Sequence, residues 1–288
     1  MSHWPDVLSR RPRLTQVELY WPHLPLELEG LRLLHVGDLH TRGWGAAEEA
    51  LSRLLAEPRF DLLVCTGDLC YPHRPKLFCT DHAAPEAAGR HTAGGFRLYP
   101  NVATALDVCA RLFSRLPRPA VAVQGNHDPK ALMERLAALG VTILANAAAV
   151  VPLPGRAPLQ VVGVRCANRD RTDAAAALAQ LRGGLFTIAL CHYPELAEAL
   201  AAGGADLVLA GHTHGGQLCL PGGRPLMTHS RTGRRYVAGL ERLASTLVFT
   251  TRGAATTFLH LRLFCPAELA LLTLRRGPIA LSGERQAG

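Results

Sequence analysis

The chain has 288 residues, 48% of them hydrophobic, which is enough for one large domain or two small ones with a sizeable core. Its formal net charge is +8 and is carried almost entirely by arginine, since Lys76 and Lys130 are the only lysines. This charge favours anionic partners such as phosphates, acidic lipid head groups or nucleic acid, or else reflects an arginine-rich solvated surface. Eight dispersed cysteines without a Cys-x-x-Cys pair exclude a disulfide scaffold, and the absence of a signal peptide or long apolar run predicts a cytoplasmic protein.

The first half of the chain alternates apolar runs with helical spacing. Residues 1–30 are interpreted as an N-terminal arm, with an edge strand at 14–20. The apolar runs after it are short enough to be buried strands, and the helical segments place leucines on one face. The predicted strands are 31–36, 61–66 and 120–123, and the predicted helices are 46–56, 102–116 and 130–139.

Residues 70–100 interrupt this pattern. The segment is rich in Pro, Gly, His and Arg and shows little periodicity. Structureless loops of this length inside a domain are usually functional, so we interpret it as an inserted cap over a site. Arg74 and Arg97 are candidate substrate contacts within it, because guanidinium groups bind phosphate. The alternative is a disordered surface insertion.

The second half again alternates strands and helices. Predicted strands are 141–143, 148–151, 159–164, 186–190 and 205–210, with helices at 172–181 and 195–202. Later strands are predicted at 235–240, 247–250 and 270–274, and residues 276–288 form a C-terminal tail. Because both faces of such sheets must be covered, the pattern predicts an α/β protein with a two-sheet core and helices outside.

Five predicted strands end in polar side chains of a few kinds. Carboxyl ends of parallel strands gather at one edge of a sheet, so these side chains should meet. Oxygen and imidazole donors without thiolate suit Mn, Fe, Zn or Ni, and the number of donors fits two ions that share a carboxylate. Two such ions about 4 Å apart are a clamp for phosphoryl transfer. The residues are Asp38, His40, Asp68, Asn126, His127, Asp128, His192, His212 and His214.

The motifs around these residues resemble the calcineurin-like metallophosphoesterase superfamily. The matching blocks are Gly37-Asp38-Leu39-His40, Gly67-Asp68, Gly125-Asn126-His127-Asp128, Cys191-His192 and Gly211-His212-Thr213-His214. The resemblance implies a four-layer αββα domain over residues 31–275. Within the superfamily, Gly215-Gly216-Gln217 and the later Arg252, Arg262, Cys265 and Glu268 resemble a bacterial branch. That branch includes membrane-associated phosphodiesterases and pyrophosphatases acting on UDP-diacylglucosamine.

The resemblance also implies roles for the site residues. Asp38, His40 and His214 would hold one divalent metal ion, Asn126, His192 and His212 a second, and Asp68 would bridge them. His127 would act as the catalytic acid toward the leaving oxygen, with Asp128 orienting its ring. The metals would be manganese, with iron and zinc as alternatives.

The implied activity is hydrolysis of a phosphodiester or pyrophosphate bond by a metal-activated hydroxide. The implied substrate is a phosphate ester or pyrophosphate, with a lipid-linked nucleotide sugar as the specific expectation, together with peripheral contact at the inner membrane surface. Two departures from the branch are Leu69-Cys70-Tyr71 after Asp68, where an acid or amide is common, and the lack of an N-terminal anchor. The alternatives are a non-catalytic metal-binding scaffold on this fold, or a nuclease, although no nucleic-acid-binding module is recognisable.

Overall fold

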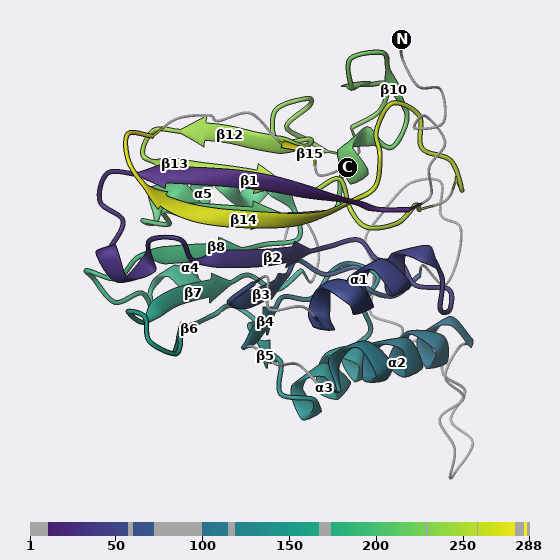
Figure 1. The fold of residues 1–288 in the computed structure, drawn as a ribbon, viewed down its shortest axis with the longest axis horizontal. Coiled ribbons are helices and arrows are strands. Elements are labelled where there is room, and N and C mark those ends of the chain that lie inside the picture. Colours follow the sequence, from purple (N-terminus) through teal and green to yellow (C-terminus); the bar gives the residue numbers. More distant parts are fainter. Residues whose placement is uncertain are drawn as a thin grey trace.

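Two β-sheets face each other in the structure, a computed structural model (Figure 1). It describes residues 11–56, 60–71, 100–114, 119–166, 174–228, 230–257, 259–279 and 285–286. The first sheet has the strand order β15-β1-β14-β2-β3-β4-β5 and the second β12-β13-β9-β8-β7-β6. The first contains β1 (Arg13–Trp21), β2 (Arg32–Val36), β3 (Leu62–Cys65), β4 (Ala120–Ala122), β5 (Thr142–Ile143), β14 (Glu268–Arg276) and β15 (Arg285–Gln286). The second contains β6 (Ala147–Val151), β7 (Leu159–Gly163), β8 (Thr187–Leu190), β9 (Leu207–Ala210), β12 (Gly239–Leu243) and β13 (Thr246–Thr250).

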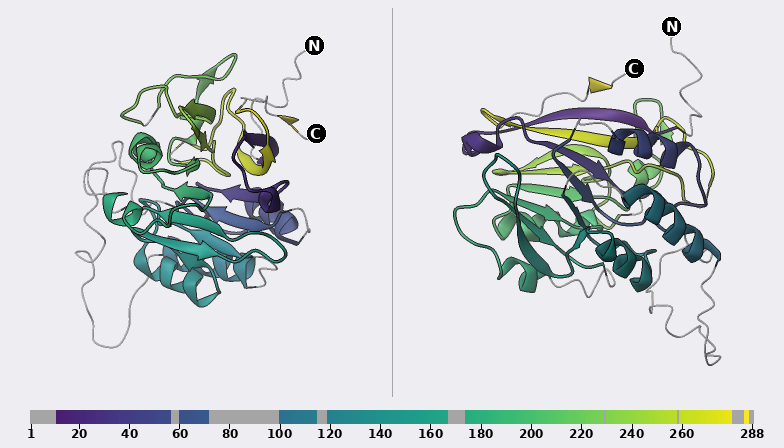
Figure 2. Two further views of the ribbon diagram at one scale, coloured as in Figure 1. Left: turned by 90° about the vertical axis from the view of Figure 1, so that its left-hand side faces the viewer. Right: turned by 60° about the horizontal axis from the view of Figure 1, so that its bottom comes forward.

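Helices cover both outer faces, which confirms the predicted αββα layers (Figure 2). The helices α1 (Ala46–Ala56), α2 (Pro100–Phe113) and α3 (Lys130–Ala138) pack on the first sheet, and α4 (Ala174–Leu178) and α5 (Ala197–Ala202) on the second. Strand alternation sorts the side chains: Leu33 of β2 enters the core between the sheets, whereas Leu34 packs with Leu51 of α1. None of the described helices is long and apolar enough to cross a bilayer.

Two local predictions need correction, and one element was not predicted. The strand expected at 235–240 begins only at Gly239, because Tyr236 has a φ of 52° and the chain before it turns. A short hairpin, β10 (Cys219–Leu220) with β11 (Arg224–Pro225), was not predicted. The predicted edge strand 14–20 is β1, which pairs with β14 along its full length; β15 adds a further strand beside Thr15 and Gln16.

The topology brings the predicted site residues to one edge of the two sheets. β2, β3 and β4 run parallel to one another in the first sheet, and β7, β8, β9 and β13 do so in the second. Loops that leave the carboxyl ends of these strands therefore meet across the two sheets. The predicted cap lies outside the described residues except at its ends, so the cap and the roles of Arg74 and Arg97 stay predictions.

Candidate metal centre

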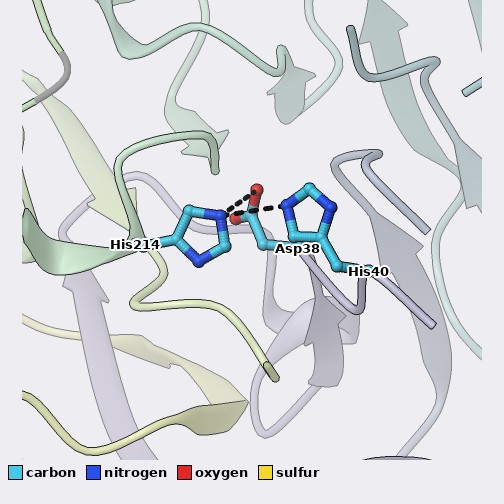
Figure 3. Close-up of side chains that lie close together, drawn as sticks. All are labelled: Asp38, His40 and His214. Atoms are coloured by element: carbon cyan, nitrogen blue, oxygen red, sulfur yellow. Dashed lines mark hydrogen bonds and ion pairs between the residues drawn. The ribbon is translucent and has the colours of Figure 1, made fainter. Parts of the chain in front are cut away.

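Asp38, His40 and His214 form the first cluster of metal-binding side chains (Figure 3). Their donor atoms lie within 4.8 Å of one another, and all three residues are buried. The Nε2 atoms of His40 and His214 are 3.0 Å apart, and the His214 Nε2 atom is 3.7 Å from Asp38 Oδ1. A carboxylate oxygen and two imidazole nitrogens thus converge from β2 and β9.

Asp68, His192 and His212 form the second cluster. His192 Nε2 lies 3.2 Å from His212 Nδ1, and Asn126 Oδ1 is 2.8 Å and 3.0 Å from those two nitrogens. Asp68 Oδ2 is 3.3 Å from His192 Nε2 and 3.6 Å from His40 Nε2, so this carboxylate lies between the two clusters. The structure therefore brings all seven predicted ligand residues together at one edge of the sandwich.

Backbone carbonyl groups set the orientation of three of these imidazole rings. The Nδ1 atoms of His40, His192 and His214 face the carbonyl oxygens of Cys70, Thr66 and Ala255 at 3.1, 2.8 and 3.3 Å. A proton on Nδ1 satisfies each carbonyl group and leaves the Nε2 lone pair directed into the site. Two such lone pairs facing each other 3.0 Å apart repel unless a cation lies beside them, so the donor set fits divalent metal ions.

The backbone at the site is strained. Ten described non-glycine residues have positive φ, and five of them are predicted ligands: Asp38, His40, Asp68, His212 and His214. Such conformations are costly for residues other than glycine and concentrate at functional sites. The surrounding fold holds these residues there, which keeps the donor atoms together.

The glycines of the motifs allow strand ends to touch. A Cβ atom on Gly67 would lie 2.3 Å from the backbone nitrogen of Gly125, and one on Gly125 would lie 2.2 Å from that of Asp68. A Cβ atom on Gly211 would meet the Asp38 carboxylate at 2.8 Å. Side chains at these positions would push the ligand-bearing loops apart, which explains why these three blocks pair glycine with a polar residue.

Asp128 anchors the loop that carries Asp68. Its Oδ2 atom accepts hydrogen bonds from the backbone amides of Asp68 and Gly125 at 2.7 and 3.0 Å, and its Oδ1 atom accepts one from Cys70 at 2.9 Å. These bonds fix the strand ends on either side of the second cluster. The sequence-based role of Asp128, orienting the His127 ring, stays a prediction.

His127 lies at the border between the site and solvent. Its backbone amide donates to Asp68 Oδ1 at 2.8 Å, while its ring Nε2 atom is 4.0 Å from Asp68 Oδ2. The His127 side chain is 13% exposed, compared with 2% for Asp68. The ring is thus near the donor clusters and accessible to a substrate.

Burial opposes charge throughout the site. It raises the pKa of Asp38 above its usual range and lowers the pKa of His40 to about 3. Burial would also raise the pKa of Asp68, but the neighbouring His192, His127 and His40 outweigh it and hold that pKa well below the usual range. The Asp68 charge in turn raises the pKa of His192 to about 9 against the effect of burial. Cations would replace protons as the partners of these carboxylates.

Sequence reasoning gave no role to Arg262, although the branch motif contains it. This buried guanidinium donates to the carbonyl oxygens of His214, Arg252, Gly253, Ala255 and Cys265, and its Nη2 atom lies 3.3 Å from His214 Nδ1. It therefore holds the loop behind one predicted ligand. The long, unperiodic segment around it gave no signal for this contact.

A second group missed by the sequence lies at the rim. Arg42 stacks over the ring of Tyr71 at 3.8 Å and hydrogen-bonds to His260. The Tyr71 ring is 6.5 Å from that of His40, so this guanidinium stands near the first cluster. An arginine two residues after a ligand is a weak signal, and only the fold places it beside a tyrosine and a histidine from distant loops.

Comparison with known proteins finds relatives named as phosphoesterases. The chain is 26% identical to the uncharacterized metallophosphoesterase YkuE of Bacillus subtilis over 262 residues, which cover 88% of this chain and 82% of YkuE. It is 32% identical to the phosphodiesterase YaeI of Escherichia coli over 193 residues, 62% of this chain and 64% of YaeI. Among solved structures, the E. coli phosphoesterase YfcE matches with a TM-score of 0.35 at 16% identity, covering 79% of this chain and 82% of YfcE.

The fold and the paired donor clusters define a class, the two-sheet αββα hydrolases with histidine and aspartate at their strand ends. The family model for calcineurin-like phosphoesterases matches residues 31–216, and the chain belongs to that family. It is a metal-dependent phosphohydrolase of the bacterial branch, as the sequence motifs predicted. The family depends on a binuclear metal centre, and the two clusters are the candidate sites for it.

Proposed function

We propose that the chain hydrolyses a phosphodiester or pyrophosphate bond at a two-metal centre bridged by Asp68. The observation that carries this proposal is the position of Asp68 Oδ2, which is 3.3 Å from a histidine of one cluster and 3.6 Å from a histidine of the other. Asp38, His40 and His214 would hold one ion, and Asn126, His192 and His212 the other. The chemistry that bound divalent cations supply is activation of water at neutral pH and neutralisation of charge on the phosphoryl group.

In this scheme two side chains of the protein, those of His127 and Arg42, act on the substrate. The backbone amide bonded to Asp68 Oδ1 places His127 beside the bridging carboxylate, and the ring remains accessible. A protonated His127 ring nitrogen would donate its proton to the leaving oxygen as the ester bond breaks. Arg42, stacked on Tyr71 at the rim, would contact a substrate phosphate oxygen.

The substrate class rests on the family and on its relatives. A diester is favoured because YaeI, a relative of the chain, is named a phosphodiesterase. A lipid-linked pyrophosphate such as UDP-diacylglucosamine is the finer proposal, drawn from the resemblance of the motifs to that branch. Manganese is the proposed metal, with iron and zinc as alternatives, because the donors are oxygen and imidazole only.

Turnover of bis-nitrophenyl phosphate by metal-free protein reconstituted with Mn, Fe or Zn tests the proposal. We expect turnover of the diester to require metal. We also expect the protein to hydrolyse a nitrophenyl phosphate monoester more slowly than the diester. Protein that binds two equivalents of metal without turning over any phosphoester would favour the scaffold alternative. Hydrolysis of DNA or RNA in preference to small diesters would favour a nuclease.

A further inference from the structure

Exposed apolar side chains gather on one part of the surface. Seven large apolar side chains are exposed among the described residues, and six of them come from the β10–β11 hairpin region and the loop at 259–264. We call these six the apolar rim. They are Leu220, Leu226, Met227, Leu259, Leu261 and Phe264, with exposed fractions from 39% to 59%. Scattered exposed leucines are ordinary, but a group confined to adjoining loops marks an interaction surface.

The backbone contacts show that these loops adjoin. The Cys219 amide donates to the Leu263 carbonyl oxygen and the Leu263 amide to that of Gln217, at 2.8 and 3.0 Å, while Leu226 pairs with Leu218 at 2.9 Å. In Figure 1 the β10 region stands out from the sandwich beside the loop that precedes β14. The loops that carry the apolar rim therefore adjoin one another and project from the sandwich.

Gln217 joins the apolar rim to the candidate metal centre. Its side-chain amide donates to the carbonyl oxygens of Thr257 and Leu259 at 3.1 and 2.9 Å and accepts from the Thr257 amide at 3.0 Å. It follows His214 by three residues, and a Cβ atom on Gly216 would lie 2.5 Å from the Met227 carbonyl oxygen. The end of the Gly-His-Thr-His-Gly-Gly-Gln motif thus fixes the hairpin root and the 259–264 loop next to a predicted ligand.

The surrounding chain is strongly basic. Residues 207–267 contain seven arginines and no lysine, against one acidic residue, Glu241. Within it, Arg262 is buried, Arg252 pairs with Glu268 and Arg235 pairs with Glu198, so the positive charge beside the apolar rim comes from the exposed arginines of the hairpin and the loop after it. Arg224 lies in β11, at the hairpin itself, and Arg231 and Arg234 follow Met227 closely in sequence; all three are exposed. Apolar side chains next to arginines match a surface that is apolar inside and anionic outside.

We propose that the apolar rim inserts into an anionic lipid bilayer and that the neighbouring arginines bind its head groups. Projecting apolar loops enter the interface between head groups and acyl chains, and each nearby arginine adds attraction to anionic lipid. A second copy of the chain fits less well, because a symmetric dimer would bring the same arginines of both copies together. Adsorption would place the active site next to lipid-linked phosphoesters, and this consequence rests on the proposed function. Adsorption to the bilayer itself does not depend on the proposed function.

Flotation with vesicles tests this inference without turnover. The probes are vesicles of phosphatidylcholine alone and of equal parts phosphatidylcholine and phosphatidylglycerol. We expect the wild-type chain to float with the anionic vesicles, and the triple variant Leu220→Ser, Met227→Ser, Leu259→Ser to lose about tenfold or more in partitioning. The matched control is Leu26→Ser, since Leu26 is the seventh exposed apolar side chain, 69% exposed, in the short helix η2 (Leu26–Leu28). That helix lies at the other end of the sheets from β10 in Figure 1, so the control should float like the wild type.

Tryptophan fluorescence checks the flotation result with a signal that appears on insertion, which a loss of folding would not produce. The Met227→Trp variant should shift its tryptophan emission to the blue on addition of anionic vesicles, whereas the Leu26→Trp variant should not. Wild-type protein that does not float, a triple variant that floats normally, or a Met227→Trp variant without a shift would each overturn the inference. So would a wild-type dimer that the triple variant converts to a monomer without any vesicle binding. Hydrolysis of bis-nitrophenyl phosphate, measured separately, reports on the proposed function alone.

Discussion

The substitution Asp128→Asn separates two roles for this buried carboxylate. Asp128 accepts three backbone hydrogen bonds, two on Oδ2 and one on Oδ1. An asparagine that keeps its oxygen toward Asp68 and Gly125 loses only the bond from Cys70. A hydrogen bond to a charged group contributes about 1.5–3 kcal/mol, so we expect the free energy of unfolding to fall by that amount. Alanine would leave three buried amides unpaired at a cost of roughly 3–9 kcal/mol, comparable with the whole stability of many domains.

The same change should weaken metal binding, because the backbone of Asp68 is held by Asp128. Partners behind a ligand typically affect metal affinity by about 10–100-fold. We would measure urea unfolding of metal-free protein and manganese affinity by calorimetry. The matched control is Asp61→Asn, at the other end of β3, whose carboxylate also accepts a backbone amide, that of Arg32, at 2.8 Å. It should lower stability without changing metal affinity.

Two results would contradict the proposed anchoring role of Asp128. If Asp128→Asn kept wild-type stability and manganese affinity but lost turnover, Asp128 would act on the His127 ring, as the sequence predicted. Loss of stability alone, with unchanged metal affinity, would show that Asp68 holds its position without the Asp128 anchor.

Three further predictions follow from individual contacts. Asp68→Ala should remove both metal ions, because one carboxylate lies between the clusters; elemental analysis finding two equivalents per chain would contradict this. His127→Ala should keep the metals and lose about 10²–10⁴-fold in rate, less for a nitrophenolate leaving group that needs no proton; a parallel fall in metal content would make His127 a ligand. Burial lowers the pKa of His35 to about 3 from 6.5, so only the unfolded chain takes up this proton as the pH falls through that range. Neutral His35 therefore makes its full contribution to the free energy of unfolding above pH 6.5. About 2 kcal/mol of this contribution is lost by pH 5. Between pH 6.5 and pH 5, the free energy of unfolding of the metal-free wild type, measured with urea, should fall by about 2 kcal/mol more than that of His35→Gln. Thr66→Val, which removes only the hydrogen bond at 3.0 Å, should keep the wild-type pH dependence, and parallel curves for wild type and His35→Gln would disprove the assignment.

The sequence determined the layers and the family because both depend on local patterns. Short continuous apolar runs such as Leu62–Cys65 favour strands buried on both faces, and helices must cover the sheets they form. The polar residues that follow these runs lie in short motifs. Asp38, Asp68 and His214 could therefore be identified as candidate ligands from their positions at predicted strand ends. Parallel topology then required them to meet at one edge.

The tertiary structure decided what depends on contacts between distant segments. The Asp128 anchor, the Arg262 contacts behind His214 and the stacking of Arg42 on Tyr71 join loops that no local period relates. The apolar rim is a case of the same kind. Its side chains come from two separate stretches of the chain, and the pairing of Leu218 with Leu263 brings these stretches together. Hydrophobic periodicity predicts which side chains are buried, but it carries no information about which exposed ones become neighbours, because that follows from the packing of the whole chain.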